Sequence, residues 1–406
     1  MKILQVNKFH YPRGGADKYF LDLTQALRTD GHEVAVFAMQ HPENQPSPWS
    51  DYFASRVSFN STRLKDRLKT PVRVLYSLEA KRKFTALISD FRPDIIHIHN
   101  IYHHLSPSIL SVAKKAKIPV VMHLHDYKLV CANHALFTAG ELCAKCQPGK
   151  YYQCLFHCCI KDSYAASALA VAEMYLHHSI LKIYKKNIDL FIAPSRFMKE
   201  TVVRSGYLPE KISVIYNGYS SEILGSPAQT EEGIRKDYLL YFGRLSPEKG
   251  LAVLVRAAAL TGQLVKIAGD GPEEANLKAL AKASSAPIEF LGHRAPAALR
   301  PLIEGARAVI IPSIWAENMP LSLLEALSLG QIVIASEIGG LPEVIKDGYN
   351  GLLSAPGDAA DLARQINRLN EIDRSKLSRA ALETAQDFSP QKNLQAVLAA
   401  YRALLR

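Results

Sequence analysis

Two series of short apolar runs, each separated from the next by an amphipathic stretch, restrict this chain to the α/β class. The first series is KILQVN, EVAVFAM, DIIHIHN, IPVVMHLH and DLFIAPS, and the second is YLLYFGRL, LVKIAGDG, IEFLGH, ARAVIIPS and QIVIASE. Helical candidates between the runs include residues 17–28, 72–91 and 107–116. Continuous apolar strands separated by helices indicate parallel sheets that are covered on both faces. We therefore predict two doubly wound, Rossmann-like domains.

The pattern restarts after ISVIYNGYSSEILGSPAQTEEG, a polar stretch rich in Gly and Ser, and we place the domain boundary within it, near residues 216–233. A chain of 406 residues, 48% hydrophobic and 21% charged, is long enough for two domains. We expect a first domain at 1–215, a second at 216–388 and a final helix within 389–406. The two sheets would present their carboxyl-end loops to a shared cleft, where ligands of open α/β sheets bind.

The formal net charge of +11 favours an anionic partner: a phosphorylated ligand, an acidic lipid surface or nucleic acid. No aromatic stacking platform or recognised nucleic-acid module occurs, so we do not expect nucleic acid to be the partner. The N-terminus, MKILQVNKFHYPRGG, lacks the features of a signal peptide, and no apolar run approaches the roughly 18 residues of a spanning helix. We expect a cytoplasmic protein that is free in solution or lies on the inner face of the cell membrane.

The stretch ENMPLSLLEALSLG, residues 317–330, predicts a helix that begins at Pro320 and is apolar on nearly every face. Such a helix is buried, and a carboxylate inside it is costly unless a partner holds it. For Glu325 the alternatives are an internal salt bridge or backbone hydrogen bond, and hydrogen bonds from a sugar diol. Glu317 precedes the first turn, where free N–H groups also bind anions such as phosphate.

Three further segments place polar groups where a predicted strand ends. FGRLSPEKG carries Arg244 and Lys249, which are either solvated cations or a clamp for a diphosphate. HYPRGGADKY carries Gly14 and Gly15 in a turn where the backbone can approach a ligand, although it is not the G-x-G-x-x-G of dinucleotide-binding folds. HLHDY carries His125, whose imidazole either orients a substrate hydroxyl or bonds its own loop.

Together these motifs resemble the retaining glycosyltransferases of family four, of the bacterial polysaccharide or lipid-linked glycan type, which adopt the GT-B fold. That family shows two glycines after the first strand, G-R-x-x-x-x-K-G after the first strand of the second domain, and two glutamates separated by seven residues. The corresponding positions here are Gly14–Gly15, 243–250, and Glu317 with Glu325. IAPSRFMKE, VIYNGY and ASEIGGLPEVIKDGYNGLL resemble other segments of the family, so the likeness spans essentially the whole chain.

The resemblance implies transfer of a sugar, with retention, from a nucleotide-sugar to a glycan or lipid-linked acceptor. Arg244 and Lys249 would hold the diphosphate, Glu325 the ribose hydroxyls, and Glu317 and His125 the transferred sugar. The implied donor-binding set also includes Gly14, Gly15, Asn318, Met319, Pro320 and Leu321. No D-x-D sequence occurs, so we expect neither a catalytic metal nor another cofactor. Front-face attack by the acceptor is the mechanism favoured for this fold, and the last helix would cross back to the first domain.

Two other classes of function stay open at this point. One is a different GT-B enzyme, such as a sugar-nucleotide epimerase or hydrolase. The other is a non-catalytic protein that binds anions or nucleic acid through its positive charge.

All six cysteines lie between Cys131 and Cys159, in a predicted insertion at 128–160. One C-x-x-C followed by C-x-x-x-C could supply four thiolates to a structural zinc ion. Those candidates are Cys143, Cys146, Cys154 and Cys158. The alternative is a set of reduced, packed thiols, since disulfides are not expected in the cytoplasm.

Residues 63–83 form a basic segment with apolar positions at roughly helical spacing. Such a segment suits an anionic membrane leaflet, and would then favour a lipid-linked acceptor. An ordinary solvated helix face is the alternative. The cations are Arg63, Lys65, Arg67, Lys69, Arg73, Lys81, Arg82 and Lys83.

Overall fold

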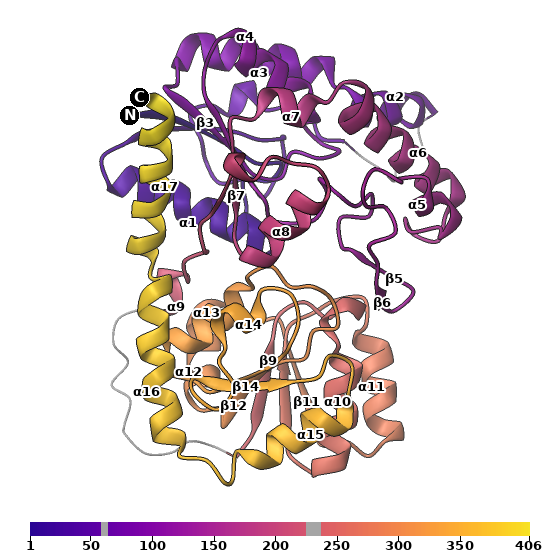
Figure 1. The fold of residues 1–406 in the computed structure, drawn as a ribbon, viewed down its shortest axis with the longest axis vertical. Coiled ribbons are helices and arrows are strands. Elements are labelled where there is room, and N and C mark those ends of the chain that lie inside the picture. The colour runs from indigo at the N-terminus through magenta and orange to yellow at the C-terminus, as the bar shows by residue number, and fades with distance from the viewer. Residues whose placement is uncertain (58–63, 225–236) are drawn as a thin grey trace. The chain divides into compact units, whose positions relative to one another are not determined.

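The computed structural model describes residues 1–57, 64–224 and 237–406, which fall into two compact units (Figure 1). Unit 1 comprises Met1–Leu136, Cys143–Tyr216 and Asn393–Arg406. Unit 2 comprises Phe137–Leu142 and Asn217–Lys392. Each unit is built on one six-stranded sheet whose neighbouring strands are parallel, so the predicted fold class is confirmed.

In unit 1 each of the five predicted runs contains a strand. A sixth strand, β8, was not predicted, because its three residues stand in the polar stretch that we read as an inter-domain connection. The order across the sheet is β2 (Glu33–Phe37), β1 (Lys2–Val6), β3 (Ile95–Ile98), β4 (Val120–His123), β7 (Leu190–Ala193) and β8 (Ile212–Val214).

The helices of unit 1 follow the sequence pattern except at 72–91. The single helix expected there is wrong, because the chain forms two helices and the Ser77 hydroxyl accepts a hydrogen bond from the Ala80 N–H at 3.1 Å to begin the second. The helices are α1 (Gly15–Thr29), α2 (Leu64–Leu75), α3 (Leu78–Phe91), α4 (Leu110–Lys115), α6 (Tyr164–Met174), α7 (Ile183–Asn187) and α8 (Arg196–Arg204).

Some cations of the basic segment are engaged inside unit 1. Arg73 pairs with Glu79 at 3.0 Å, and Lys83 donates to the Phe53 carbonyl at 2.5 Å. Arg63 lies outside the described residues, as do the side chains of Lys65, Arg67 and Lys69. Of the helices that the structure describes, none is long and apolar enough to cross a bilayer.

Unit 2 contains all five runs predicted for the second half, and a sixth strand, β14, that was not predicted. The order is β11 (Ile288–Gly292), β10 (Val265–Ala268), β9 (Leu239–Phe242), β12 (Ala308–Ile311), β13 (Val333–Ser336) and β14 (Gly351–Ser354). Its longer helices are α10 (Leu251–Thr261), α11 (Glu274–Ala283), α12 (Pro296–Glu304), α13 (Leu321–Ser328), α15 (Ala359–Arg368) and α16 (Arg374–Ala385), and α9 (Ser221–Leu224) and α14 (Leu341–Val344) are single turns. Because β9 and β12 are neighbours, the loops that follow them meet at one edge of the sheet.

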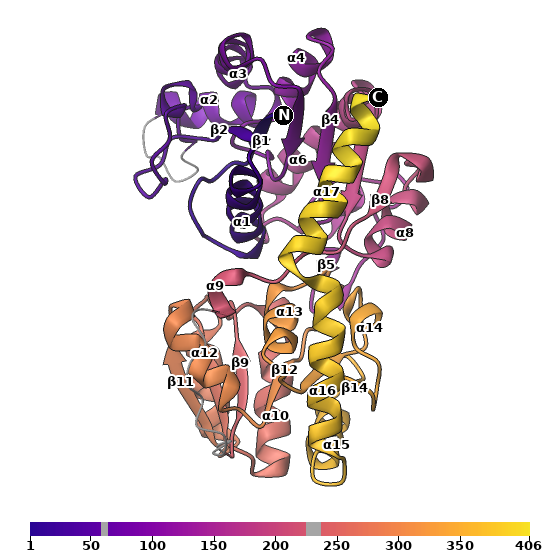
Figure 2. The ribbon, with the colours of Figure 1, turned by 90° about the vertical axis from the view of Figure 1, so that its left-hand side faces the viewer.

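The last helix, α17 (Pro390–Leu405), occupies the predicted residues, and from Asn393 onward it belongs to unit 1. Figure 2 shows it in yellow beside the sheet of that unit. Val397, Leu398 and Tyr401 share an apolar core with residues of α1 and of β1, β3, β4 and β7. The Tyr401 hydroxyl lies 2.6 Å from His97 Nδ1, and so ties this helix to the middle of the sheet.

Candidate active site

The loops after β9 and β12 in unit 2 are in direct backbone contact. The Ile314 N–H donates to the Glu248 carbonyl at 3.1 Å. Gly250 has φ +69°, and a Cβ there would lie 1.9 Å from the Pro312 oxygen, so the contact requires glycine. Sequence positions more than sixty residues apart are thereby joined at the carboxyl edge of the sheet, where open α/β sheets bind ligands.

The loop after β10 joins the same edge. A Cβ on Gly269 would lie 1.9 Å from the Gly243 oxygen, and one on Gly271 would lie 2.2 Å from the Leu245 oxygen. The Leu245 N–H donates to the Asp270 carbonyl at 2.7 Å. Our sequence analysis gave no role to GDGPEE, residues 269–274. A G-x-G directly after a strand is nevertheless a sign that the backbone there approaches another loop closely.

Lys249 and Glu317 form an ion pair at the centre of these loops. Lys249 Nζ lies 2.7 Å from Glu317 Oε1, and the Ser313 hydroxyl donates to the same oxygen at 2.7 Å. Burial alone would raise the pKa of Glu317, but the charge of Lys249 and hydrogen bonds from Lys249, Ser313 and the Trp315 side chain bring it below its usual value. Glu317 is therefore an ionised carboxylate held in one orientation.

The backbone around Glu317 leads directly into α13. The helix begins at Leu321, one residue later than predicted, with Pro320 as its N-cap. The N-cap residue Pro320 makes no side-chain hydrogen bond to the first turn. The Glu317 carbonyl accepts from the Gly340 N–H at 2.7 Å, and the Met319 carbonyl accepts from Asn217 Nδ2 at 3.3 Å. A fixed loop thus presents an uncapped helix N-terminus, which favours an anion.

The remaining predicted donor-site residues of unit 2 differ in exposure. Glu325 is 8% exposed within the buried helix α13, and Asn318 and Met319 in the preceding loop are also buried. Arg244 is exposed, and within the described part of the chain its guanidinium forms no hydrogen bond or ion pair. Its backbone is held by the Tyr241 hydroxyl, which donates to the Arg244 carbonyl at 2.8 Å. Binding of a donor diphosphate by Arg244 stays a prediction.

In unit 1 the two predicted glycines stand at the start of α1. Gly14 is the N-cap with extended backbone, and Gly15 is the first helical residue. A Cβ on Gly14 would have no atom of the described chain within 4 Å, so packing does not demand glycine there. The turn is instead held by buried Asp17, which accepts from Asn7 Nδ2 at 2.9 Å. A role for Gly14 and Gly15 in ligand binding stays a prediction.

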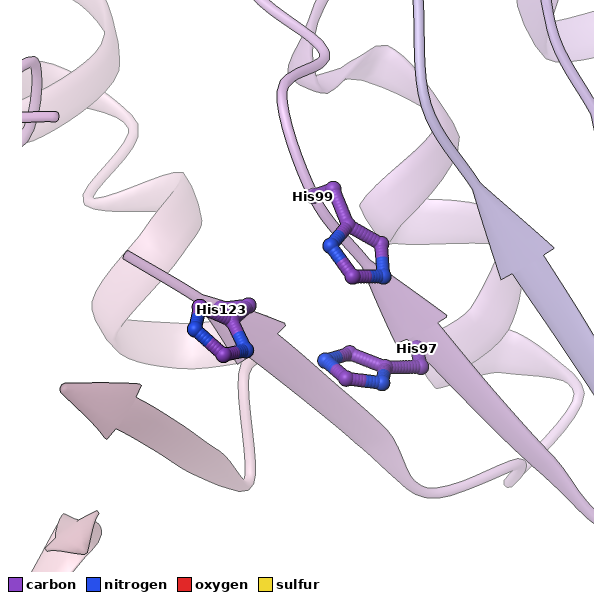
Figure 3. Close-up of side chains that lie close together, drawn as sticks. All are labelled: His97, His99 and His123. Carbon is purple, nitrogen blue, oxygen red and sulfur yellow. The ribbon is translucent and has the colours of Figure 1, made fainter. Parts of the chain in front are cut away.

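Three buried histidines, His97, His99 and His123, lie together at the ends of β3 and β4 (Figure 3), and the half-buried His125 stacks on His123. His125 Nε2 lies 2.8 Å from His99 Nδ1, and the rings of His123 and His125 are 4.5 Å apart and nearly parallel. Our sequence interpretation named only His125. The signal was present, because histidines at alternate positions of DIIHIHN and VVMHLHD place their side chains on one face of the sheet.

Nitrogen atoms of His97, His99 and His123 all lie within 4.8 Å of one another, the spacing of a metal-binding group. Two of these rings are already engaged, however. His99 Nε2 lies 2.8 Å from Gln5 Oε1, and His97 Nδ1 is bonded to Tyr401. The geometry is that of a hydrogen-bonded stack that joins β3, β4 and α17.

Because these histidines are removed from water, we predict that the free energy of unfolding of the protein falls in mild acid. Burial lowers the pKa of His97, His99 and His125 well below the ordinary value of 6.5. Below about pH 6.5 the unfolded chain takes up protons that the folded chain refuses, so the free energy of unfolding falls by about 1.4 kcal/mol per histidine between pH 7.5 and 5.5. Urea unfolding at the two pH values measures this.

Buried carboxylates cannot produce the same loss, since the pKa of Glu317 is lowered and its contribution disappears only below about pH 4.5. Replacing His97 by glutamine should reduce the difference between the two pH values. Equal unfolding free energies at pH 7.5 and 5.5 would contradict the assignment.

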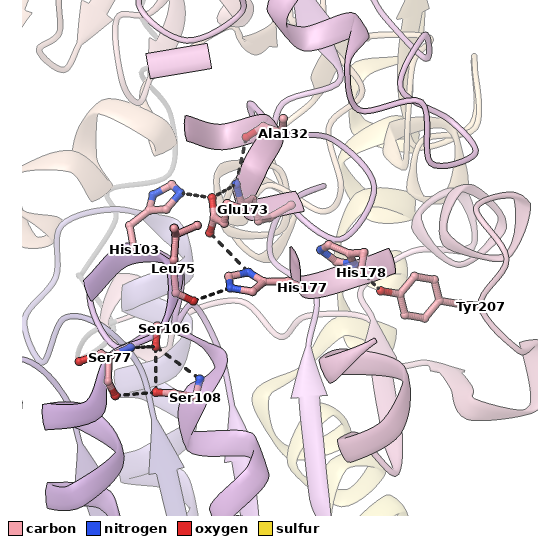
Figure 4. A network of polar contacts seen from close by, with 11 residues as sticks. Leu75, Ser77, His103, Ser106, Ser108, Ala132, Glu173, His177, His178 and Tyr207 are labelled. Atoms are coloured by element: carbon pink, nitrogen blue, oxygen red, sulfur yellow. Dashed lines mark hydrogen bonds and ion pairs between the residues drawn. The ribbon is translucent and has the colours of Figure 1, made fainter. Parts of the chain in front are cut away.

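A buried ion pair fixes the loop that follows His125. Lys128 Nζ lies 2.8 Å from Glu173 Oε2, and both side chains are almost fully buried. Figure 4 shows Glu173 between His103, which lies 3.1 Å from the same oxygen, and His177. The Lys128 N–H also donates to the Asp126 carboxylate at 2.9 Å. The backbone beside His125 is thus anchored to α6 rather than free to move.

Unit 1 also contains a hollow of about 710 Å³ beyond β1 and β2. Cations outnumber carboxylates in its lining, where Glu43 is the one acidic residue. Among the described residues, Arg56 and Lys161 form no hydrogen bond or ion pair. Polar and charged residues of the lining include Tyr11, Arg13, His41, Glu43, Arg56 and Lys161. Such a hollow suits an anionic ligand.

Two doubly wound parallel-sheet domains, with cations and a bare helix N-terminus at the strand ends of the second, define a glycosyltransferase of the GT-B type. Residues 13–222 match the model of Glycosyltransferase Family 4, and residues 226–388 match that of Glycosyl transferases group 1. The chain belongs to glycosyltransferase family 4.

Curated relatives resemble the chain along most of its length. The uncharacterized 42.6 kDa protein in the cps region of Klebsiella pneumoniae is 25% identical over 85% of this chain and 87% of its own. A D-inositol 3-phosphate glycosyltransferase of Arthrobacter is 28% identical over 96% of this chain and 90% of its own.

Solved structures share the fold. The Anabaena protein HepE in complex with UDP matches with a TM-score of 0.67 and 20% identity, over 99% of this chain and 100% of its own. A glycosyltransferase of Rickettsia africae matches with a TM-score of 0.72 and 18% identity, over 100% and 98% of the two chains.

Proposed function

We propose that this glycosyltransferase moves a sugar, with retention and without a metal ion, from a nucleotide-sugar to a glycan or lipid-linked acceptor. The observation that carries the proposal is the Lys249–Glu317 ion pair directly before the N-terminus of α13, with the exposed Arg244 in the same loop as Lys249. Fixed positive charge and bare amides at one sheet edge suit a diphosphate that gains charge as it leaves.

The cations can supply a useful part of the rate enhancement. At about 4 Å and an effective dielectric constant of about 20, one cation–anion contact is worth up to roughly 4 kcal/mol before desolvation. Arg244 and Lys249 together would thus provide a fraction of the roughly 8–23 kcal/mol that enzymes supply. In this role they take the place that a metal ion holds in other transferases.

Glu317 is suited to hold the donor rather than to attack it. Its carboxylate is tied to Lys249 and Ser313, which restrains it and lowers its nucleophilicity. We assign it to the hydroxyls of the transferred sugar and to the orientation of Lys249. Glu325 is assigned to the ribose and His125 to the sugar hydroxyls, which is consistent with front-face attack by the acceptor.

The experiment is a panel of UDP-, GDP- and ADP-sugars in the presence of EDTA, read by thermal shift and by nucleotide release. The UDP and UDP-glucose complexes of HepE make UDP-sugars the first choice. Stabilisation with turnover and an α-configured product from an α-configured donor would support the proposal. Loss of turnover in EDTA would overturn the metal independence, and an inverted product would overturn the retention of configuration.

The rival functions give different results in the same panel. Free sugar or an epimer released without an acceptor would indicate a hydrolase or an epimerase. Nucleotide-induced stabilisation without any turnover would indicate a non-catalytic binding protein.

The cationic hollow of unit 1 supports an acceptor that carries an anionic group. Several curated relatives are named for D-inositol 3-phosphate, a phosphorylated polyol. We expect Arg13→Ala combined with Arg56→Ala to raise the KM for the acceptor roughly 100-fold or more, because each of the two lost charged hydrogen bonds costs about 1.5–3 kcal/mol. The thermal shift produced by the donor nucleotide should not change.

The matched control for the hollow is Lys115→Ala, which removes an exposed cation of the same unit outside the hollow. An unchanged acceptor KM in the double variant, or an equal rise in Lys115→Ala, would count against the assignment.

If the acceptor is lipid-linked, residues 63–83 supply basic groups for an anionic membrane surface. We expect the protein to sediment with vesicles that contain acidic lipid and to stay in solution with neutral ones, an effect that 0.5 M salt should remove because screening weakens surface charge interactions. Co-sedimentation that is independent of acidic lipid would contradict this location.

A further inference from the structure

The cysteines predicted as zinc ligands are not brought together by the structure. Among the described residues no three cysteine sulfurs lie within metal-ligand spacing of one another, and all six thiols are free. The predicted set was Cys143, Cys146, Cys154 and Cys158. The buried ionic cluster beside this segment is instead centred on the helix that follows it, α6.

Glu173 of α6 is the centre of that cluster and is surrounded by basic groups. Its Oε2 atom lies 2.8 Å from Lys128 Nζ and 3.1 Å from His103 Nε2 (Figure 4). Burial alone would raise the pKa of Glu173, but the charge of Lys128 and the hydrogen bond from His103 bring it below its usual value. Glu173 is therefore an ionised carboxylate that two partners share.

The stability of the fold is a weak reason for this cluster. A buried ion pair is often no more stabilising than two apolar side chains of similar size, because both charges lose their water. Within the described chain Glu173 Oε1 accepts no hydrogen bond, and His177 Nδ1 lies 3.9 Å from it. A costly and incompletely bonded carboxylate points to a role in fixing one arrangement of the chain around it.

The first partner of Glu173 fixes the loop that follows β3. His103 has φ +65°, a left-handed conformation that a residue other than glycine keeps only where its surroundings hold it. The neighbouring His104 lines the cationic hollow, and its ring centroid lies 5.4 Å from that of Phe9, another residue of the lining. The bond from His103 to Glu173 thereby holds the loop that carries one wall of the hollow.

The second partner fixes the loop that follows β4. Lys128 Nζ also donates to the Ala132 carbonyl at 3.1 Å, and the Lys128 N–H donates to the Asp126 carboxylate at 2.9 Å. These bonds close the chain around residues 126–132, directly after His125. The same buried carboxylate therefore holds the loops of both ligand-binding features proposed for unit 1.

The helix that carries Glu173 also begins beside the hollow. Ser163 is its N-cap and accepts a hydrogen bond from the Ala166 N–H at 3.3 Å. Lys161, two residues earlier, belongs to the lining of the hollow. One regular helix thus joins a cation of the hollow to the buried carboxylate.

We propose that Glu173 is a positioning residue for the acceptor, which holds the wall of the cationic hollow and the loop of His125 in one relative arrangement through His103 and Lys128. It acts through these two side chains and not by contact with the substrate. The inference rests on the proposed function in one respect, namely that the hollow binds the acceptor and His125 the sugar. Binding of the donor nucleotide in unit 2 should not depend on Glu173.

The test removes both charges of the pair, so that no buried charge is left without its partner. In Glu173→Leu combined with Lys128→Met we expect the kcat/KM for the acceptor to fall roughly 10- to 100-fold, because small displacements of binding groups have effects of this size. The thermal shift produced by the donor nucleotide should not change. Glu173→Gln keeps an oxygen that can accept from either partner, and should retain more activity than the double variant.

The matched control is Lys114→Met combined with Asp189→Leu. Lys114 Nζ lies 3.8 Å from Asp189 Oδ1, and Asp189 also accepts from the N–H of Val120, the first residue of β4. This lysine–carboxylate pair therefore lies at the opposite edge of the same sheet, and its removal should leave the acceptor kinetics unchanged. Wild-type acceptor kinetics in the Glu173 double variant, or an equal loss in the control, would overturn the proposal.

A variant at the edge of the cluster keeps the proposal testable if the double variant does not fold. The His103 side chain is 40% exposed, so His103→Ala should fold, and we expect it to raise the acceptor KM roughly 3- to 10-fold. His157→Ala, which removes an exposed histidine of the same unit, should not.

Amide hydrogen exchange adds a measurement that needs no turnover. Exchange in residues 101–106 and 126–132 should be faster in His103→Ala and in the Glu173 double variant, and unchanged in the two controls. Unchanged exchange in these loops would overturn the proposal. A wild type that turns over no nucleotide-sugar would overturn the proposed function instead, and exchange would still decide whether Glu173 holds the two loops.

Discussion

Replacing Arg244 by alanine is expected to lower kcat/KM for the nucleotide-sugar by roughly 100-fold or more and to leave Tm unchanged within about 1 °C. The guanidinium is exposed and forms no ion pair with the described chain, so its removal breaks no internal interaction. A bidentate guanidinium–phosphate contact that strengthens as the diphosphate leaves acts on the transition state, and 100-fold corresponds to about 2.7 kcal/mol.

Steady-state kinetics with the best donor of the panel, together with a thermal melt, measures both halves of this prediction. Arg256→Ala is the matched control, because Arg256 is an exposed arginine of the same unit on α10. Arg244→Lys should recover only part of the activity, since an ammonium cannot make the bidentate contact. Wild-type turnover in Arg244→Ala would remove Arg244 from the site.

Replacing Lys249 by alanine is expected to reduce both activity and stability. The change leaves Glu317 buried without its cation, a situation that costs about 3–5 kcal/mol for fully buried pairs and somewhat less here, because the Lys249 side chain is 23% exposed. We expect the free energy of unfolding to fall by about 2–4 kcal/mol. The kcat/KM for the donor should fall by more than 100-fold.

The double variant Lys249→Met with Glu317→Gln separates the two effects. Removing both charges takes away the unpaired carboxylate, so most of the lost stability should return while the activity stays low. Urea unfolding and donor kinetics on the single and double variants give the comparison. A Lys249→Ala protein as stable as the wild type would show that the 2.7 Å pair contributes nothing to the fold.

The strands were predictable because their signal is local. A run such as ARAVIIPS is apolar wherever it packs, and it contains β12. The break between α2 and α3 was missed because it depends on one cap, Ser77, inside an otherwise helical pattern. β8 was missed because three residues carry too little periodicity to outweigh the polar stretch around them.

The sequence was enough to predict which residues belong to the candidate site, but not which of them contact one another. Arg244, Lys249 and Glu317 could be assigned to strand ends from the sequence, since ligand-binding loops follow strands in this fold class. That Lys249 pairs with Glu317 depends on β9 lying beside β12, which spacing along the chain does not reveal. The same holds for His97 and His99, whose partners come from strands and a helix far away in sequence.

The placement of residues 393–406 in unit 1 has a consequence for biosynthesis. Unit 2 is continuous from Asn217 to Lys392 apart from one hairpin, so nearly all of it leaves the ribosome before unit 1 has received Tyr401. Until then Gln5 and His97 lack the hydroxyl that joins them, and the apolar face of the first sheet that α1 and α17 share is covered by α1 without α17. The domain begun first is therefore finished last, and a nascent chain halted before residue 393 would be a client for chaperones.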